Sequence, residues 1–143
     1  MDRLSLLSGS PLFEMLSNQE LEAISALLTP RELPAGATIF AEGTLGDGLY
    51  LVESGEVEVL SSTRAGPLAT LTEGECFGEM ALVDKDYRSA TVKARTDVRL
   101  LHLSPEGLAQ FRKVQKDGFC FLVMNIARLL SVRLREANRH TGS

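Results

Sequence analysis

The segment FGEMALVDKDYRSATV, residues 77–92, brings together a glycine, a carboxylate and an arginine that can bind an anion. Gly78 has no side chain, so a ligand can approach its backbone closely. Residues 79–83 can form one helical turn whose first N–H groups favour an anion. Arg88 adds a planar fork of donors that matches two phosphate oxygens. One arginine without a lysine or a magnesium site suits a singly charged phosphodiester better than a triphosphate.

Glu79 is the second charged residue of this segment, and it needs a partner other than the phosphate, which would repel it. An ionised carboxylate only accepts hydrogen bonds, and a ribose 2'-hydroxyl beside the phosphate is a suitable donor. The two charges can therefore bind opposite sides of one sugar-phosphate. In the alternative interpretation, Glu79 and Arg88 pair with each other across a β-bulge and stabilise the loop by about 1 kcal/mol or less if exposed. Residue chemistry alone does not separate the two.

Other catalytic and metal-binding motifs are absent from the sequence. It contains no GxSxG, no HExxH and no calcium-loop spacing. Cys76 and Cys120 have no CxxC and no nearby histidine, so we predict neither a metal site nor a disulfide framework. His102 and His140 stand alone and are interpreted as an ordinary strand residue and a tail residue. We therefore predict no catalytic residues, no metal and no enzymatic activity.

The glycine-rich stretch GTLGDG, residues 43–48, is the other candidate for phosphate binding. It lies between predicted strands, and neither a helix nor Lys-Ser/Thr follows it. A nucleotide P-loop requires both. We interpret the stretch as a turn.

Length and composition predict one domain over residues 1–143, since 44% apolar residues can fill a single core. The formal net charge of −4 lacks the basic excess needed for non-specific nucleic-acid binding. Residues 1–104 carry 8 Lys/Arg against 16 Asp/Glu, whereas residues 105–143 carry 7 against 3. The N-terminal apolar stretch is too short for a signal peptide, and no run approaches the roughly 20 apolar residues of a membrane span. We expect a cytoplasmic protein without a membrane span.

The element pattern changes twice along the chain. Residues 1–30 are predicted to be a helical segment, with a helix over 18–28 that begins at a capping box of Ser17 and Glu20. Residues 31–103 alternate short β-rich runs with glycines, which is typical of an antiparallel sandwich or barrel with about eight strands. The run LYLVESGEVEVL is predicted to be a hairpin that turns at Ser54-Gly55.

Residues 104–140 return to helix. Ser104 followed by proline predicts a helix that begins there and extends to about Lys116. Asp117-Gly118 is predicted to break it. A second helix from Phe119 carries an apolar stripe wide enough to cover more than one neighbour.

The segment 77–92 resembles the phosphate-binding cassette of the cyclic nucleotide-binding domain family, which includes regulatory subunits of cAMP-dependent kinase, cyclic-nucleotide-gated channels and the bacterial catabolite activator. FGE, the Met-Ala-Leu that follows and Arg-Ser-Ala-Thr-Val match the family pattern without a gap. The similarity extends from PLFEMLSNQELEAI through LPAGATIFAEGTLGDGLYLVESGEVEV to the closing helices. It implies a mainly β fold: an eight-stranded antiparallel, jelly-roll-like β-roll with an N-terminal helical segment and C-terminal B and C helices that move as a lid.

The resemblance also implies roles for residues of the cassette. Glu79 would bind the ribose 2'-hydroxyl, and Arg88 would pair with the exocyclic phosphate oxygens. Gly78 and the N–H of Ala81 would line the ring and phosphate, and the Met80 side chain would contact the base or sugar.

Ser89 leaves the choice of nucleotide open. It would add its N–H or hydroxyl to the phosphate, which is compatible with cAMP, but it also resembles the position that bonds guanine in cGMP-selective relatives. We expect cAMP as the ligand, with cGMP as the alternative and no other cofactor. The contact that caps the base is expected from the C helix, where the candidates are Leu130, Arg133, Leu134 and Asn138.

The expected partners follow from the same resemblance. The bacterial regulators carry a helix-turn-helix after the C helix, and this sequence ends at Ser143, so we expect no direct DNA binding. The signal would pass to a protein effector, or to a second copy through the apolar stripe as a two-fold dimer. Two alternatives remain: a β-roll interaction domain that binds no nucleotide, and the sensor part of a longer transcription regulator.

Overall fold

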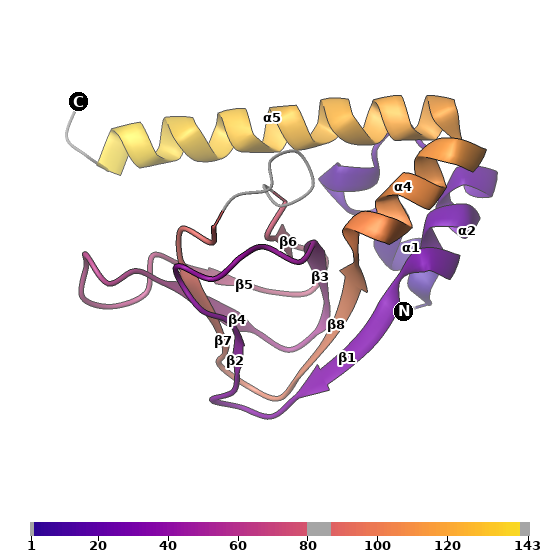
Figure 1. The fold of residues 1–143 in the computed structure, drawn as a ribbon. Helices are drawn as coiled ribbons and strands as arrows, with labels where there is room; N and C mark the ends of the chain where they lie inside the picture. The colour runs from indigo at the N-terminus through magenta and orange to yellow at the C-terminus, as the bar shows by residue number, and fades with distance from the viewer. Residues whose placement is uncertain (1, 80–86, 141–143) are drawn as a thin grey trace. The chain divides into compact units, whose positions relative to one another are not determined.

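The computed structural model describes residues 2–79 and 87–140, and the side chains of 2–79 and 87–136. Two compact units divide the chain: a helical unit, Met1–Ala26 with Phe111–Ser143, and a β unit, Leu27–Gln110. The helices of the described residues are α1 (Arg3–Ser8), the 3-10 helix η1 (Pro11–Phe13), α2 (Asn18–Leu27), α4 (Pro105–Val114) and α5 (Lys116–His140) (Figure 1). The strands are β1 (Thr29–Leu33), β2 (Thr38–Phe40), β3 (Leu49–Ser54), β4 (Val57–Leu60), β5 (Ala69–Leu71), β6 (Cys76–Phe77), β7 (Thr91–Ala94) and β8 (Val98–Leu103). That all 143 residues act as one domain stays a prediction.

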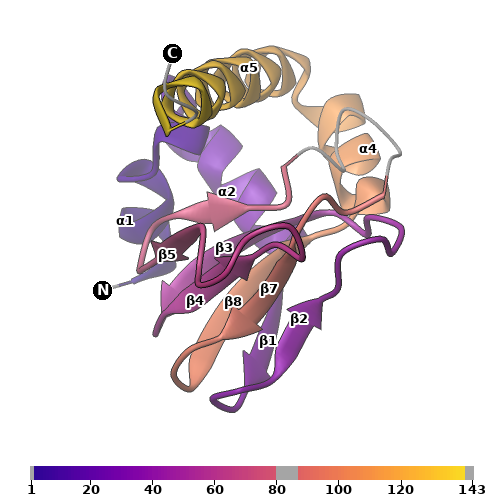
Figure 2. The same ribbon diagram turned by 90° about the vertical axis from the view of Figure 1, so that its left-hand side faces the viewer.

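The strands of the described part form two four-stranded antiparallel sheets, ordered β1-β8-β3-β6 and β2-β7-β4-β5. Figure 2 shows β8 beside β1 in one sheet and β7 beside β2 in the other. This arrangement confirms the predicted fold class, a mainly β protein of eight antiparallel strands flanked by helices. The strands begin at Thr29, two residues before the predicted boundary.

Side chains from both sheets form one core inside the β unit. Tyr50 and Phe77 come from the first sheet, Val57 and Val92 from the second, and none is more than 3% exposed. Phe40 packs against this cluster, with its ring centroid 6.0 Å from Tyr50 and 5.9 Å from Phe77. The Phe40 ring also contacts Arg88, and the Tyr50 hydroxyl contacts Asp47.

The predicted hairpin over β3 and β4 is wrong, because the two strands lie in different sheets. β3 pairs with β8 and β6, whereas β4 pairs with β5 and β7. Between them, Gly55 passes so close to the main chain of Asp97 that a Cβ there would collide with its carbonyl oxygen. The chain therefore turns a corner from one sheet to the other. The alternation of Val57 and Val59 with glutamates marked a buried face but did not specify the pairing partner.

The helical unit confirms the predicted capping box. The main-chain N–H of Ser17 donates to Oε1 of Glu20 at 2.8 Å, and the N–H of Glu20 donates to Oγ of Ser17 at 3.2 Å. Buried Asn125 on α5 donates to the carbonyl oxygens of Leu12 at 2.9 Å and Glu14 at 2.8 Å. This amide fixes α5 to the segment around η1.

The predicted break at Asp117-Gly118 is wrong, because Gln115 alone separates α4 from α5. Gly118 lies in the first turn of α5, where a Cβ would be 2.9 Å from the Glu20 carboxylate and 3.0 Å from Cζ of Phe111. This glycine therefore permits close packing and does not end a helix. The Oγ of Ser104 accepts the N–H of Gly107 at 3.0 Å, which confirms the predicted cap of α4. None of the helices described has the length and apolar content that a membrane span needs.

Candidate functional site

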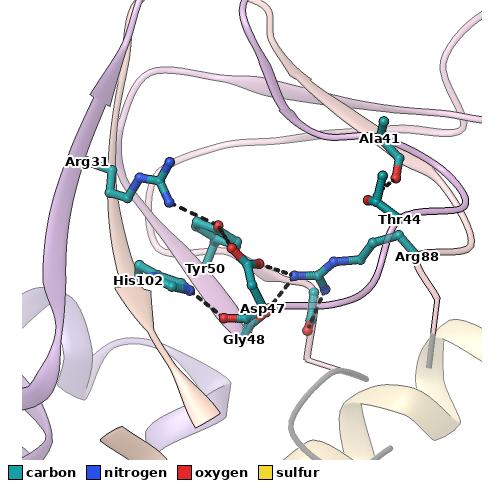
Figure 3. Close-up of polar contacts among 9 residues, drawn as sticks. Arg31, Ala41, Thr44, Asp47, Gly48, Tyr50, Arg88 and His102 are labelled. Atoms are coloured by element: carbon teal, nitrogen blue, oxygen red, sulfur yellow. Dashed lines mark hydrogen bonds and ion pairs between the residues drawn. The ribbon is translucent and has the colours of Figure 1, made fainter. Parts of the chain in front are cut away.

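Arg88 is the centre of the site, and only 7% of this residue is exposed. Its Nη2 donates to Oδ1 of Asp47 at 2.8 Å and to the carbonyl oxygen of Gly48 at 2.9 Å, and its Nη1 donates to the carbonyl oxygen of Gly78 at 3.1 Å (Figure 3). Its Cζ also lies 3.9 Å from the centroid of the Phe40 ring. The guanidinium is thus fixed by an ion pair, two carbonyl oxygens and an aromatic face.

Part of the hydrogen-bonding capacity of Arg88 is left for a ligand. A guanidinium has five N–H donors, and the contacts above account for three of them. The Nε of Arg88 is buried, and it has no hydrogen-bond acceptor in the part of the chain that the structure describes. Leaving a buried charged donor without an acceptor costs free energy. An anionic oxygen beside Nε would remove that cost, so the residue fits a phosphate.

Two glycines let the backbone approach this guanidinium. Gly78 has a φ of 78°, and a Cβ there would lie 2.8 Å from Nη1 of Arg88. Gly48 has a φ of 123°, and a Cβ there would collide with the carbonyl oxygen of Leu103 and lie 3.0 Å from Nε2 of His102. Any side chain at either position would displace the carbonyl oxygens that hold Arg88.

Asp47 links Arg88 to Tyr50, whose hydroxyl donates to Oδ2 of Asp47 at 3.0 Å. Partial burial acts to raise the pKa of Asp47, but the hydrogen bonds from Tyr50 and Arg88 and the nearby positive charges outweigh it, so the pKa lies below 3.8. Burial, together with the neighbouring carboxylate, raises the pKa of Tyr50 to about 12. At neutral pH the pair is therefore a phenol that donates to a carboxylate.

The stretch 43–48 is a connection that leads into β3, as the predicted turn requires, and it also supports the site. The N–H of Arg88 donates to the carbonyl oxygen of Thr44 at 2.7 Å, and the N–H of Gly43 donates to that of Arg88 at 2.8 Å. Asp47 and Gly48, the last residues of the stretch, then hold the guanidinium. The sequence analysis missed these two residues. One feature of the sequence could have indicated Asp47. It is a carboxylate between two glycines, and Arg88 in the segment 77–92 needs an anionic partner.

The structure brings Gly78, Glu79 and Arg88 together. Glu79 is 3% exposed and directly follows Gly78, whose carbonyl oxygen accepts from Arg88. Arg88 forms an ion pair with Asp47. The alternative interpretation named Glu79 as the partner of Arg88 and did not mention Asp47. Ser89 is exposed and directly follows Arg88. Two predicted site residues, Met80 and Ala81, lie outside the described residues. The same holds for the predicted helical turn over 79–83, of which only Glu79 is described.

The structure also locates the remaining sequence candidates. The residues proposed to cap a base, Leu130, Arg133, Leu134 and Asn138, are on α5 in the helical unit. Within residues 2–79 and 87–140, no three His, Cys, Asp or Glu side chains are grouped so that they could hold a metal ion. The buried Arg88, whose Nε has no acceptor among the described residues, suits an anion.

Comparison with known proteins gives a family. Residues 30–115 match the model of the cyclic nucleotide-binding domain. The cyclic AMP receptor protein of Thermus thermophilus is 40% identical over 136 residues, which cover 92% of this chain and 61% of that protein. The cAMP-dependent protein kinase regulatory subunit of Aspergillus fumigatus is 40% identical over 103 residues, which cover 72% of this chain and 25% of that protein.

A solved structure gives the same result. The N-terminal domain of a transcriptional regulator from Streptomyces coelicolor superimposes with a TM-score of 0.80 at 33% identity, and the match covers 94% of this chain and 95% of that one. The chain spans about three-fifths or less of the two curated relatives above. The matched family model, the relatives and the fold agree: the chain belongs to the cyclic nucleotide-binding domain family.

Proposed function

We propose that this chain is a non-enzymatic sensor of cAMP that regulates a partner protein or a further part of its own polypeptide. The observation that carries the proposal is buried Arg88, which is held by Asp47 and by two glycine carbonyl oxygens and has an Nε without an acceptor among the described residues. A singly charged cyclic phosphate would supply that acceptor and form a charge-assisted hydrogen bond with the guanidinium. The names of the Thermus and Aspergillus relatives, a cyclic AMP receptor protein and a cAMP-dependent kinase subunit, support the choice of nucleotide.

The proposed binding mode uses both charges of the cassette. Arg88 binds the exocyclic phosphate oxygens, and Glu79 accepts a hydrogen bond from the ribose 2'-hydroxyl. Gly78 and the N–H of Ala81 line the ring and phosphate. Because Glu79 and Arg88 are both at least nine-tenths buried, the bonds that they would form are shielded from competing water.

Ser89 and Met80 complete the proposed set of ligand-binding residues. Ser89 would add its N–H or hydroxyl to the phosphate, and Met80 would contact the base or sugar. The base itself would be capped from α5, where Leu130, Arg133, Leu134 and Asn138 are the candidates. Ser89 is also compatible with cGMP. The proposal therefore has two parts: the chain binds a cyclic nucleotide, and it prefers cAMP to cGMP.

A titration of the protein with cAMP, cGMP and a cyclic dinucleotide tests the proposal. We expect cAMP to bind more tightly than cGMP, and the dinucleotide to bind poorly because one arginine cradle serves only one of its two phosphates. Calorimetry gives the affinity and the stoichiometry. Failure of all three ligands would favour the alternative of a β-roll interaction domain that binds no nucleotide.

Signal transmission is the second part of the proposal. Nucleotide binding would shift the C-terminal helices between open and closed positions. The apolar residues of α5 that are exposed, among them Met124 at 52% and Leu134 at 64%, would then contact a protein effector or the same helix of a second copy. Hydrogen exchange of α5 and sedimentation, each with and without cAMP, test this step. Unchanged exchange in a strict monomer would contradict it.

The names of two relatives favour one context for this sensor. The Streptomyces match is the N-terminal domain of a transcriptional regulator, and the Thermus protein is longer than this chain. We therefore propose a cytoplasmic regulator in which the chain described here senses the nucleotide and makes no direct DNA contact of its own. Coding sequence for a helix-turn-helix after residue 143 would support this context.

A further inference from the structure

His102 lies on β8 with its ring stacked on Tyr50, at a centroid distance of 4.5 Å and an interplanar angle of 19°. The sequence predicted an ordinary strand residue. Its Nε2, however, lies 2.8 Å from the carbonyl oxygen of Asp47. A carbonyl oxygen only accepts, so Nε2 carries the proton and donates it to this bond. Because the ring is stacked, the direction of this donor is fixed.

Asp47 is therefore held at three atoms by three different side chains (Figure 3). His102 donates to its carbonyl oxygen, the Tyr50 hydroxyl to its Oδ2, and Arg88 to its Oδ1. The next carbonyl oxygen, that of Gly48, accepts from Arg88 as well. A continuous series of direct contacts thus leads from His102 through the Asp47–Gly48 segment to the guanidinium.

The segment needs this support. The Asp47 side chain is 54% exposed, and an exposed carboxylate gains little from an ion pair alone, because fixing it costs side-chain entropy. Gly48 gives the main chain extra freedom at the same point. The imidazole lies directly against the segment, since a Cβ on Gly48 would be 3.0 Å from Nε2 of His102. The hydrogen bond from His102 restricts the main chain directly before this glycine.

We propose that His102 is a positioning residue for nucleotide binding, which fixes the Asp47–Gly48 segment so that Arg88 is held ready for the phosphate. This inference rests on the proposed function and adds to it a residue outside the cassette. His102 acts through Asp47 and Gly48 and touches no part of the nucleotide. Its contribution is preorganisation, which reduces the ordering cost at the moment of binding.

Two substitutions test the role. His102→Leu removes the donor, and we expect a roughly 3- to 10-fold loss of cAMP affinity by calorimetry, the effect of one neutral hydrogen bond. His102→Gln keeps a side-chain N–H and should restore most of the affinity. In an Asp47→Ala background, His102→Leu should weaken binding less than it does in the wild-type protein. Wild-type affinity in a folded His102→Leu variant would overturn the proposal.

A measurement without nucleotide separates this inference from the proposed function. In isotope-labelled protein, His102→Leu should shift and broaden the NMR signal of the Arg88 Nε–H, while His102→Gln should leave it near its wild-type position. If no cyclic nucleotide binds but these shifts occur, the proposed function fails and the positioning network stands. If the Arg88 signal is unchanged in His102→Leu, the positioning role fails, whatever the protein binds.

Discussion

Nη2 of Arg88 lies 2.8 Å from Oδ1 of Asp47, so two residues 41 positions apart in the sequence form one ion pair. The two partners differ in exposure: the Arg88 side chain is 5% exposed and the Asp47 side chain 54%. The partly exposed Asp47 carboxylate therefore compensates the buried positive charge of Arg88. The Nε–H of the guanidinium stays available for a second anion. This asymmetry allows the pair to support a ligand site.

Replacing Asp47 tests the structural half of this relationship. We expect Asp47→Ala to lower the free energy of unfolding by about 1–2 kcal/mol, between the values typical of exposed and of buried ion pairs, because it leaves a buried guanidinium with fewer acceptors. Urea denaturation measures the change. Glu56→Ala is a matched control, since Glu56 pairs with Arg95 at 3.6 Å between exposed side chains, and it should cost less than about 0.5 kcal/mol. Equal costs for the two variants would contradict the account.

Gly48→Ala tests the close approach of the loop to β8. The new Cβ would collide with the carbonyl oxygen of Leu103, so we expect a loss of about 2–4 kcal/mol in the free energy of unfolding. Gly66→Ala is the control: Gly66 also has a positive φ, 75°, but no atom lies within 4 Å of its added Cβ. It should cost only about 1–2 kcal/mol, from backbone strain alone. A Gly48→Ala variant as stable as Gly66→Ala would show that the loop lies elsewhere.

The ionisation of Tyr50 reports on the network around Asp47. The chain has two tyrosines and no tryptophan, so ultraviolet absorbance of a Tyr87→Phe variant follows Tyr50 alone. We expect a pKa of about 12 instead of 10.0, because of burial and the Asp47 carboxylate, and a lower value when Asp47→Asn is added. A raised pKa of this acid means that its contribution to stability is complete below pH 10 and is lost as the pH rises through about 12. Titration near 10 would contradict the contact with Asp47.

The role of Glu79 can be isolated with a ligand that lacks one hydroxyl. We expect the wild-type protein to bind cAMP roughly 10- to 100-fold more tightly than 2'-deoxy-cAMP, the effect of a hydrogen bond to a charged group. Glu79→Ala should remove this preference, whereas Glu73→Ala, at an exposed glutamate, should keep it. Competition binding measures all six affinities, those of the wild type and the two variants for each ligand. A preference for the ribose form that survives in Glu79→Ala would assign the hydroxyl to another residue.

Local signals in the sequence identified the elements that depend on neighbouring residues. The capping box of Ser17 and Glu20 and the N-cap at Ser104 have specific geometries, so the structure confirms them. The partner of β3 was not predictable in this way. An alternating pattern shows which face of a strand is buried, but the corner at Gly55 depends on the main chain of Asp97, far away in the sequence. Gly118 was misinterpreted for a similar reason, since its packing against Glu20 cannot be read from a helical pattern.

The same distinction holds for the site. The sequence brought Gly78, Glu79 and Arg88 into one segment, where spacing alone was informative. Asp47 and His102 lie far from that segment along the chain, and their contacts arise only when the two sheets form. A lone histidine in an alternating strand carries no local sign of its partner, and a carboxylate in a glycine-rich turn is common.

A comparison of cAMP binding by the wild-type protein and by Arg88→Ala most directly tests the central claim that Arg88 holds the phosphate of a cyclic nucleotide. The account predicts one molecule bound per wild-type chain and a loss of about 2–4 kcal/mol, roughly 30- to 700-fold, in Arg88→Ala. Arg64→Ala, at an exposed arginine, should bind as the wild type does. Wild-type affinity for cAMP in a folded Arg88→Ala variant would contradict the account.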